Sequence, residues 1–351
     1  MKRWLLGSTL DELVEICNSL SLPSYTAKQI AAWIYDKGVT EIDQMSNLSK
    51  SARLVLSERF VVGGYSADEV QQSTDGTKKY LFPALTGTTV EAVTIPDAER
   101  ATLCLSCQSG CKMGCSFCMT GRMGFKGSLI AGEIISQVMN VEESRELTNI
   151  VFMGMGEPLD NYNEVIKSTE ILTAEWGFGW SPKRITVSSI GIIPALKSFL
   201  ESSKCHLAIS MHNPFDSERA EFMPMQKAYP ISKVVELIRR YDFTGQRRVS
   251  FEYTMFSGWN DTKRHADAVV RLLKGLECRV NLIRFHEIPD FRYKTSPNVV
   301  IENFRERLNS AGILATIRAS RGEDILAACG MLSSKQKSKE IEKRIERDER
   351  S

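Results

Sequence analysis

A regular alternation of strand-like and helix-like segments runs from Arg100 to Arg318. The strand-like segments are short and rich in β-branched residues, and they cover residues 102–106, 149–153, 184–188, 206–210, 248–254, 279–285 and 314–318. Between them lie longer segments whose apolar residues recur with a helical period. Strands separated by helices of this length predict a parallel sheet with crossover helices. We therefore expect an α/β fold, a partial TIM-like (β/α)6 barrel, with a doubly wound open sheet as the alternative.

The segments on either side of this alternation have different patterns. Residues 10–62 carry apolar residues at helical spacing, with a break at Pro23 and a capping serine at Ser49. Residues 63–99 instead show the short alternating runs of β-strands, and the last residues are dense in Lys, Glu and Arg. The sequence thus predicts a helical accessory domain (1–62), a β-rich connecting segment (63–99), the α/β domain (100–332) and a charged, flexible tail (333–351).

The overall composition excludes some classes of protein. Of the 351 residues, 42% are hydrophobic and 25% are charged, and the formal net charge is +2. This balance provides no global positive field, so any contact with a nucleic acid must come from local basic clusters such as Lys183-Arg184. No apolar run is long enough for a membrane span or a signal peptide. We expect a cytoplasmic protein in which the nine cysteines are thiols, metal ligands or redox catalysts rather than disulfides.

Three cysteines, Cys111, Cys115 and Cys118, follow the first strand of the alternation with the spacing C-x3-C-x2-C. Thiolates this close together on one loop are typical ligands of an iron–sulfur cluster. A four-iron cluster held by three cysteines keeps one iron open to a small molecule, which distinguishes a catalytic site from a closed structural one. The alternative is a structural zinc site, in which Cys107 would supply the fourth thiolate.

Unusual residues also follow the other strands. Because ligands of parallel α/β folds collect at the carboxyl ends of the strands, we expect these residues to surround one site. Each of them alone would be read as part of an ordinary turn, but together they predict a ligand pocket. They are Gly156, Glu157, Ser188, Ser210, Met211, His212 and His286, together with Cys329 after the last strand.

These motifs resemble the radical S-adenosylmethionine (SAM) superfamily and, within it, the family of RNA adenine methyltransferases. The resemblance covers residues 4–332 and rests on the cysteine loop and on long matching segments at 22–35, 100–104, 152–158 and 322–330. It implies that Cys111, Cys115 and Cys118 hold a 4Fe-4S cluster whose open iron binds SAM. It also implies that the residues at the strand ends cradle SAM. One departure concerns His286, because better-known members carry asparagine at this position.

The resemblance further implies a mechanism and partners. Cys329 matches the family's methyl-carrying cysteine, Cys104 its resolving cysteine, which forms a transient disulfide with Cys329, and Glu91 a proposed proton acceptor. Two SAM molecules are used per turnover. The implied substrates are an adenosine of 23S rRNA near the peptidyl-transferase centre, before full ribosome assembly, and the adenosine 3′ of the anticodon in tRNA. An electron donor of the flavodoxin or ferredoxin type and a monomeric state are also implied.

The motifs leave several alternatives open. They do not separate methylation at C2 of adenine from methylation at C8, which a related branch of the family performs; overall similarity favours C2. A radical activase acting on a protein would use the cluster but would not need the pair formed by Cys104 and Cys329. A non-catalytic alternative is a zinc-stabilised RNA-binding module. Cys107 has no assigned role.

Overall fold

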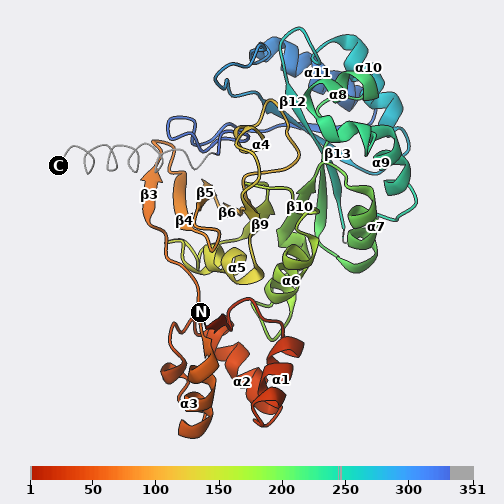
Figure 1. Ribbon diagram of the computed structural model, residues 1–351. Coiled ribbons are helices and arrows are strands. Elements are labelled where there is room, and N and C mark those ends of the chain that lie inside the picture. The colour runs from red at the N-terminus through yellow and green to blue at the C-terminus, as the bar shows by residue number, and fades with distance from the viewer. Residues whose placement is uncertain (1, 244, 246, 333–351) are drawn as a thin grey trace, which may run out of the picture.

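The protein is built around one ten-stranded sheet with helices packed against it, as the computed structural model shows (Figure 1). The structure describes residues 2–243, 245 and 247–332, so the predicted tail at 333–351 lies outside the described residues. The strands lie in the order β14-β13-β12-β11-β10-β9-β6-β5-β4-β3. In chain order they are β3 (Glu69–Gln72), β4 (Lys78–Pro83), β5 (Thr89–Asp97), β6 (Arg100–Cys104), β9 (Asn149–Phe152), β10 (Ile185–Ser189), β11 (His206–Ser210), β12 (Val249–Met255), β13 (Arg279–Arg284) and β14 (Leu314–Ile317).

Seven neighbouring strands of this sheet, β6 and β9 to β14, are parallel. Crossover segments with helices connect them, which confirms the predicted α/β fold. These helices are α4 (Met119–Arg122), α5 (Ala131–Met139), α6 (Tyr162–Thr173), α7 (Ile193–Ser202), α8 (Asp216–Phe222), α9 (Ile231–Ile238), α10 (Lys263–Leu273) and α11 (Asn298–Ser310), with the short 3-10 turns η3 (Pro182–Arg184) and η4 (Pro224–Lys227). The strand order follows the chain order without reversal, whereas a doubly wound sheet reverses at a switch point. The fold is therefore the partial barrel-like one, and its seven parallel strands correspond to the seven strand-like segments of the sequence.

The sheet is an open one. Within the described part of the chain, β14 and β3 form its two edges. The strands β3, β4 and β5 pair with antiparallel neighbours, and β5 pairs antiparallel with β6. The segment predicted as a separate β-rich connection thus extends the same sheet that carries the parallel strands.

The N-terminal residues form a helical module below the sheet (Figure 1). It contains β1 (Arg3–Trp4), α1 (Leu10–Ser19), α2 (Tyr25–Ala31), the π-helical turn η1 (Ala32–Asp36), η2 (Ile42–Gln44), α3 (Lys50–Arg59) and β2 (Phe60–Val61). Thr9 begins α1 with a capping box to Glu12, and Ser49 caps α3 as its sequence position predicts. Gly7 joins the module to α5 at very close range. A Cβ atom on Gly7 would lie 2.1 Å from the Gly132 nitrogen, so only glycine fits there.

Two groups of apolar side chains stabilise this arrangement. The larger group is continuous from Leu5 in the N-terminal module through the sheet to Leu332. The smaller one surrounds the cysteine loop and includes Phe117, Phe222 and Phe256. Within the described residues, no helix has both the length and the apolar character needed to cross a membrane.

Candidate functional site

Most of the predicted site residues line one cavity at the carboxyl ends of the parallel strands. We call it the cysteine cavity. The predicted residues on its wall are Cys111, Cys115, Cys118, Gly156, Glu157, Ser188, Ser210, His212 and Cys329. They come from the ends of four strands, β6, β9, β10 and β11, and from the loop after β14, and they are brought together because the carboxyl ends of parallel strands meet at one edge of the sheet.

The loop that carries the three cysteines is folded tightly around the cavity mouth. The short strands β7 (Gln108–Ser109) and β8 (Gly127–Ser128) pair and close its base. Gly110 has a φ of 71°, and a Cβ atom there would lie 1.7 Å from the Gly124 carbonyl oxygen. The amide of Ser116 donates to the carbonyl of Phe222, which docks the loop on the end of α8. Glycine is therefore required for this turn, and α8 fixes its position.

The donor set of this loop fits an iron–sulfur cluster. Cys111, Cys115 and Cys118 are free thiols on the wall of one cavity, with apolar side chains behind them. Burial raises the pKa of all three thiols, to about 12 for Cys111. Thiolates are the ligands that such a cluster needs. Among the described residues, no group of three or more His, Cys, Asp or Glu is placed to hold a single metal ion.

Gly156 and Glu157 follow β9 and form the part of the wall next to the cysteine loop. Gly156 has a φ of 104°, and its Cα approaches Gln108 so closely that a Cβ atom would lie 2.6 Å from the Gln108 Cβ. Burial raises the pKa of Glu157 to about 7, although hydrogen bonds from Ser189, Ile190 and Leu159 favour its charged form. The Glu157 carboxylate is thus held rigidly by main-chain amides at the cavity wall.

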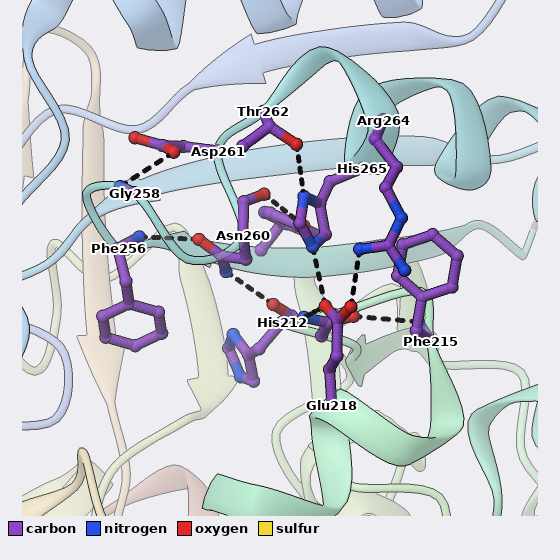
Figure 2. A network of polar contacts seen from close by, with 12 residues as sticks. His212, Phe215, Glu218, Phe256, Gly258, Asn260, Asp261, Thr262, Arg264 and His265 are labelled. Carbon is purple, nitrogen blue, oxygen red and sulfur yellow. Dashed lines mark hydrogen bonds and ion pairs between the residues drawn. The ribbon is translucent and has the colours of Figure 1, made fainter.

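His212 lies at the end of β11 with a strained backbone, because its φ is 56°. Its Nδ1 accepts a hydrogen bond from the Thr254 amide at 3.0 Å, so the ring proton is on Nε2. Burial lowers the pKa of His212 to about 3, and the imidazole is therefore neutral. Asn260 donates to the His212 carbonyl at 2.6 Å and holds this backbone in place (Figure 2). His212 thus offers a fixed N–H donor rather than a charge.

A polar network behind His212 joins α8 to the start of α10 (Figure 2). The Glu218 carboxylate accepts hydrogen bonds from Asn213 at 3.0 Å and from Arg264 at 2.6 Å, and it lies 2.7 Å from His265 Nε2. Thr262 contacts the other ring nitrogen of His265 at 2.7 Å. The network fixes α8, and α8 in turn supports both His212 and the cysteine loop.

The next residue of α8, Arg219, points inward and is only 1% exposed. Its guanidinium donates to the carbonyls of Ile190, Ser210 and Met211. The side chain of Met211 is fully buried, and this predicted site residue does not line the cysteine cavity, because its amide is paired with the Glu252 carbonyl and its carbonyl with Arg219. Arg219 thus ties together the ends of two strands that carry predicted cofactor residues. No simple motif in the sequence marks it, because its partners are carbonyl groups.

Cys104 and Cys329 meet at a second cavity, which we call the Cys104 cavity. It shares Cys118, Arg318 and Cys329 with the cysteine cavity, so these residues form a common wall. Burial raises the pKa of Cys104 to about 12, with a further contribution from Cys329. Cys329 is accessible from the cavities but surrounded by protein, and this burial raises its pKa as well. The Arg318 cation opposes both shifts.

The loop that carries Cys329 is held from two sides. On one side, the Asp324 carboxylate accepts from Ser73 and Thr74 in the turn between β3 and β4. On the other side, the amide of Met119 donates to the Gly330 carbonyl at 2.8 Å, next to the cysteine loop. The antiparallel extension of the sheet therefore positions the loop that carries the predicted methyl carrier.

Glu91 lies in β5, and its carboxylate is 3.6 Å from Lys79 Nζ. Both side chains are almost fully buried, and Lys79 also donates to the Ile325 carbonyl at 2.5 Å in the Cys329 loop. His286 lines the Cys104 cavity, and it lies 3.7 Å from Glu323. His286 therefore lies near Cys104 and Cys329, whereas Glu91 lines neither cavity and is linked to the Cys329 loop through Lys79.

The comparisons with known proteins define the class first. Residues 105–269 match the model of the radical SAM superfamily. The crystal structure of a radical SAM methyltransferase from Sphaerobacter thermophilus is similar over 95% of this chain and 100% of that chain, with 39% identity and a TM-score of 0.88. The fold and the cysteine cavity thus belong to a radical SAM enzyme.

More specific similarities cover nearly the whole chain. Residues 4–62 match the family described as ribosomal RNA large subunit methyltransferase N-terminal domain. The probable dual-specificity RNA methyltransferase RlmN of Parabacteroides distasonis is 55% identical over 95% of this chain and 97% of its own length. The dual-specificity RNA methyltransferase RlmN of Syntrophus aciditrophicus is 41% identical over 93% and 95%. The chain belongs to the RlmN family of RNA methyltransferases. The predicted family and enzyme class are confirmed, and a non-catalytic zinc module is not supported.

Proposed function

We propose that this enzyme methylates C2 of adenosine in 23S rRNA near the peptidyl-transferase centre and in tRNA at the position 3′ of the anticodon. The observation that carries the proposal is the position of Cys329 on the wall common to the two cavities. A methyl group on its sulfur can be loaded and activated from the cysteine cavity and delivered to a base in the Cys104 cavity. Membership of the RlmN family supports C2 over C8.

The cofactors that we propose follow from the donor set. Cys111, Cys115 and Cys118 would hold a 4Fe-4S cluster, since they supply only thiolates. The proposed SAM-binding residues are Gly156, Glu157, Ser188, Ser210, Met211, His212 and His286; Met211 would act only indirectly, from behind the cavity wall, and His286 would act from the neighbouring cavity. When bound, the cluster supplies an electron, and two SAM molecules per turnover supply the methyl group and a 5′-deoxyadenosyl radical.

The chain's own residues then carry the group transfer. The Cys329 thiolate takes the methyl group, and its S-methyl carbon loses a hydrogen atom and bonds to C2 of the adenine. The adduct would return one electron to the cluster, and Cys104 or Glu91 would accept the C2 proton; Cys104 lines the cavity and is the better placed. The Cys104 sulfur then attacks the Cys329 sulfur and forms a disulfide, the bond from the Cys329 sulfur to carbon breaks, and the proton taken from C2 passes to that carbon. A thiol reductant then restores both cysteines.

The substrate adenosine would enter the Cys104 cavity. Four arginines line this cavity and match the charge of RNA phosphates; they are Arg100, Arg284, Arg318 and Arg321. A base must be unstacked to reach the cavity, which fits rRNA before full ribosome assembly and a tRNA loop. We propose that residues 1–62 help to bind these RNAs, that the enzyme is a cytoplasmic monomer, and that a flavodoxin or ferredoxin supplies the electron.

Nucleoside mass spectrometry of rRNA and tRNA from cells with and without the gene tests this function. We expect 2-methyladenosine to disappear with the gene and to return with the wild-type gene but not with Cys329→Ala. Cys104→Ala should accumulate an RNA adduct on Cys329, visible on a denaturing gel. Cys107→Ser is the matched control and should methylate normally. Loss of 8-methyladenosine instead, or full activity of Cys329→Ala, would overturn the proposal.

A further inference from the structure

Glu252 is a buried glutamate on the wall of the cysteine cavity that the preceding mechanism does not use. It lies in β12 and is 4% exposed. Its Oε1 accepts hydrogen bonds from Ser250 Oγ at 2.9 Å and from Asn281 Nδ2 at 2.8 Å. Its Oε2 is buried and accepts no hydrogen bond from any described residue. The Arg318 cation is 4.0 Å away, which is beyond hydrogen-bond distance.

An oxygen of this kind is unusual in a folded protein. Burying a carboxylate without hydrogen bonds has a high free-energy cost, and nearly all buried polar atoms have a partner. The carboxylate cannot easily turn away, because Ser250 and Asn281 fix its other oxygen. A hydrogen-bond donor for Oε2 would therefore have to come from a ligand in the cysteine cavity.

The sheet register shows where this donor would lie. Ser210, Glu252 and Asn281 are register partners on β11, β12 and β13, so their side chains form one row on the same face of the sheet. β12 is separated from β9, which precedes Gly156 and Glu157, by the two strands β10 and β11. A ligand whose amino-acid end lies at the cysteine loop and Glu157 would therefore extend its other end toward this row.

We propose that Glu252 Oε2 accepts a hydrogen bond from a ribose hydroxyl of the SAM nucleoside. The inference rests on the proposed function, because that function supplies the cofactor. A ribose hydroxyl is a neutral donor of the right kind, and carboxylates commonly bind ribose hydroxyls in nucleotide sites of α/β proteins. Glu252 is then a cofactor-binding residue, and the Ser250 and Asn281 side chains are positioning residues that orient it.

The test is a binding measurement on the anaerobically purified enzyme with its cluster. Glu252→Gln keeps the shape and the bonds to Oε1 but places an N–H donor at the position of Oε2. We expect SAM and S-adenosylhomocysteine to bind about 10- to 100-fold more weakly to this variant, the usual effect of losing a hydrogen bond to a charged group. Iron content and circular dichroism should match the wild type.

Two controls make the result specific. Glu236→Gln makes the same substitution at an exposed glutamate of α9 that lines neither cavity, so its affinity for SAM should stay close to that of the wild type. The 2′-deoxy and 3′-deoxy analogues of S-adenosylhomocysteine identify the hydroxyl, because one of them should bind more weakly to the wild type but not to Glu252→Gln. Equal affinity of wild type and Glu252→Gln would overturn the inference, as would an equal loss in Glu236→Gln. If the analogue lacking the adenine amino group, rather than a deoxy analogue, abolished the difference, the ribose assignment would be wrong. RNA methylation by the wild type is scored separately, so failure of the proposed function is distinguishable.

Discussion

The buried pair of Lys79 and Glu91 allows a quantitative prediction. Their charged atoms are 3.6 Å apart, and the two side chains are 5% and 3% exposed. With an effective dielectric constant of about 20, Coulomb's law gives an attraction of about 5 kcal/mol at this distance. Lys79→Met keeps the apolar stem but leaves the buried Glu91 carboxylate without this cation. We expect the free energy of unfolding to fall by about 3–5 kcal/mol.

Urea denaturation of four proteins tests this prediction: the wild type, Lys79→Met, Glu91→Gln and the double variant. If the two charges interact directly, the double variant loses less stability than the sum of the single variants, since removing both charges leaves no buried charge uncompensated. Lys78→Met is the matched control. Lys78 pairs with Glu142 and Glu143 at a more exposed site, so its loss should cost about 1 kcal/mol or less. Additive losses, or a smaller effect for Lys79→Met than for Lys78→Met, would refute the reasoning.

Two further predictions concern the Cys329 loop and the pH dependence of stability. Asp324→Ala removes the acceptor for Ser73 and Thr74. Cys329 should then react several-fold faster with iodoacetamide, as measured by peptide mass spectrometry. Asp290→Ala, at an exposed aspartate, is the control. An unchanged rate in Asp324→Ala would show that these hydrogen bonds do not hold the Cys329 loop in place. Burial lowers the pKa of His206 to about 4 from an ordinary value of 6.5, so folding opposes its protonation. The contribution of His206 to the free energy of unfolding should therefore be fully present above about pH 6.5 and be lost as the pH decreases toward 4. Over this pH range the urea midpoint of His206→Gln should decrease less than that of the wild type.

Local pattern predicted much of the fold. The strand expected at 206–210 occupies the same residues in the structure, because its apolar residues lie between clear turn and helix signals. The sequence also predicted Ser49 as the N-cap of a helix, and Ser49 caps α3 in the structure. The short helix α8 was not predicted, since Asp216–Phe222 has only two turns and a mostly polar composition. The pairing of β5 with β6 also escaped prediction, because an antiparallel pair added to a parallel sheet leaves no periodic signal.

For the site, too, local motifs were predictable from the sequence, whereas contacts between distant segments were not. The cysteine spacing and the glycine at 156 are local, and they predicted residues that do line the cysteine cavity. Lys79, Arg219 and Glu252 were missed because their partners include main-chain carbonyls or side chains on other strands. Lys79, for example, donates to a carbonyl 246 residues further along the chain. Glu91 was named from the family resemblance, but its buried partner could come only from the structure.

The close contact between Gly7 and Gly132 limits the movement of the N-terminal module relative to the cavities. Because two backbones touch there without side chains between them, the N-terminal module cannot slide along α5 without a clash. The module is therefore held at a fixed position on α5. If the module binds RNA as proposed above, a bound RNA has to present its adenosine at a fixed distance from the module. Two RNAs as different as a ribosomal segment and a tRNA would then be selected by a common distance rather than by a common sequence.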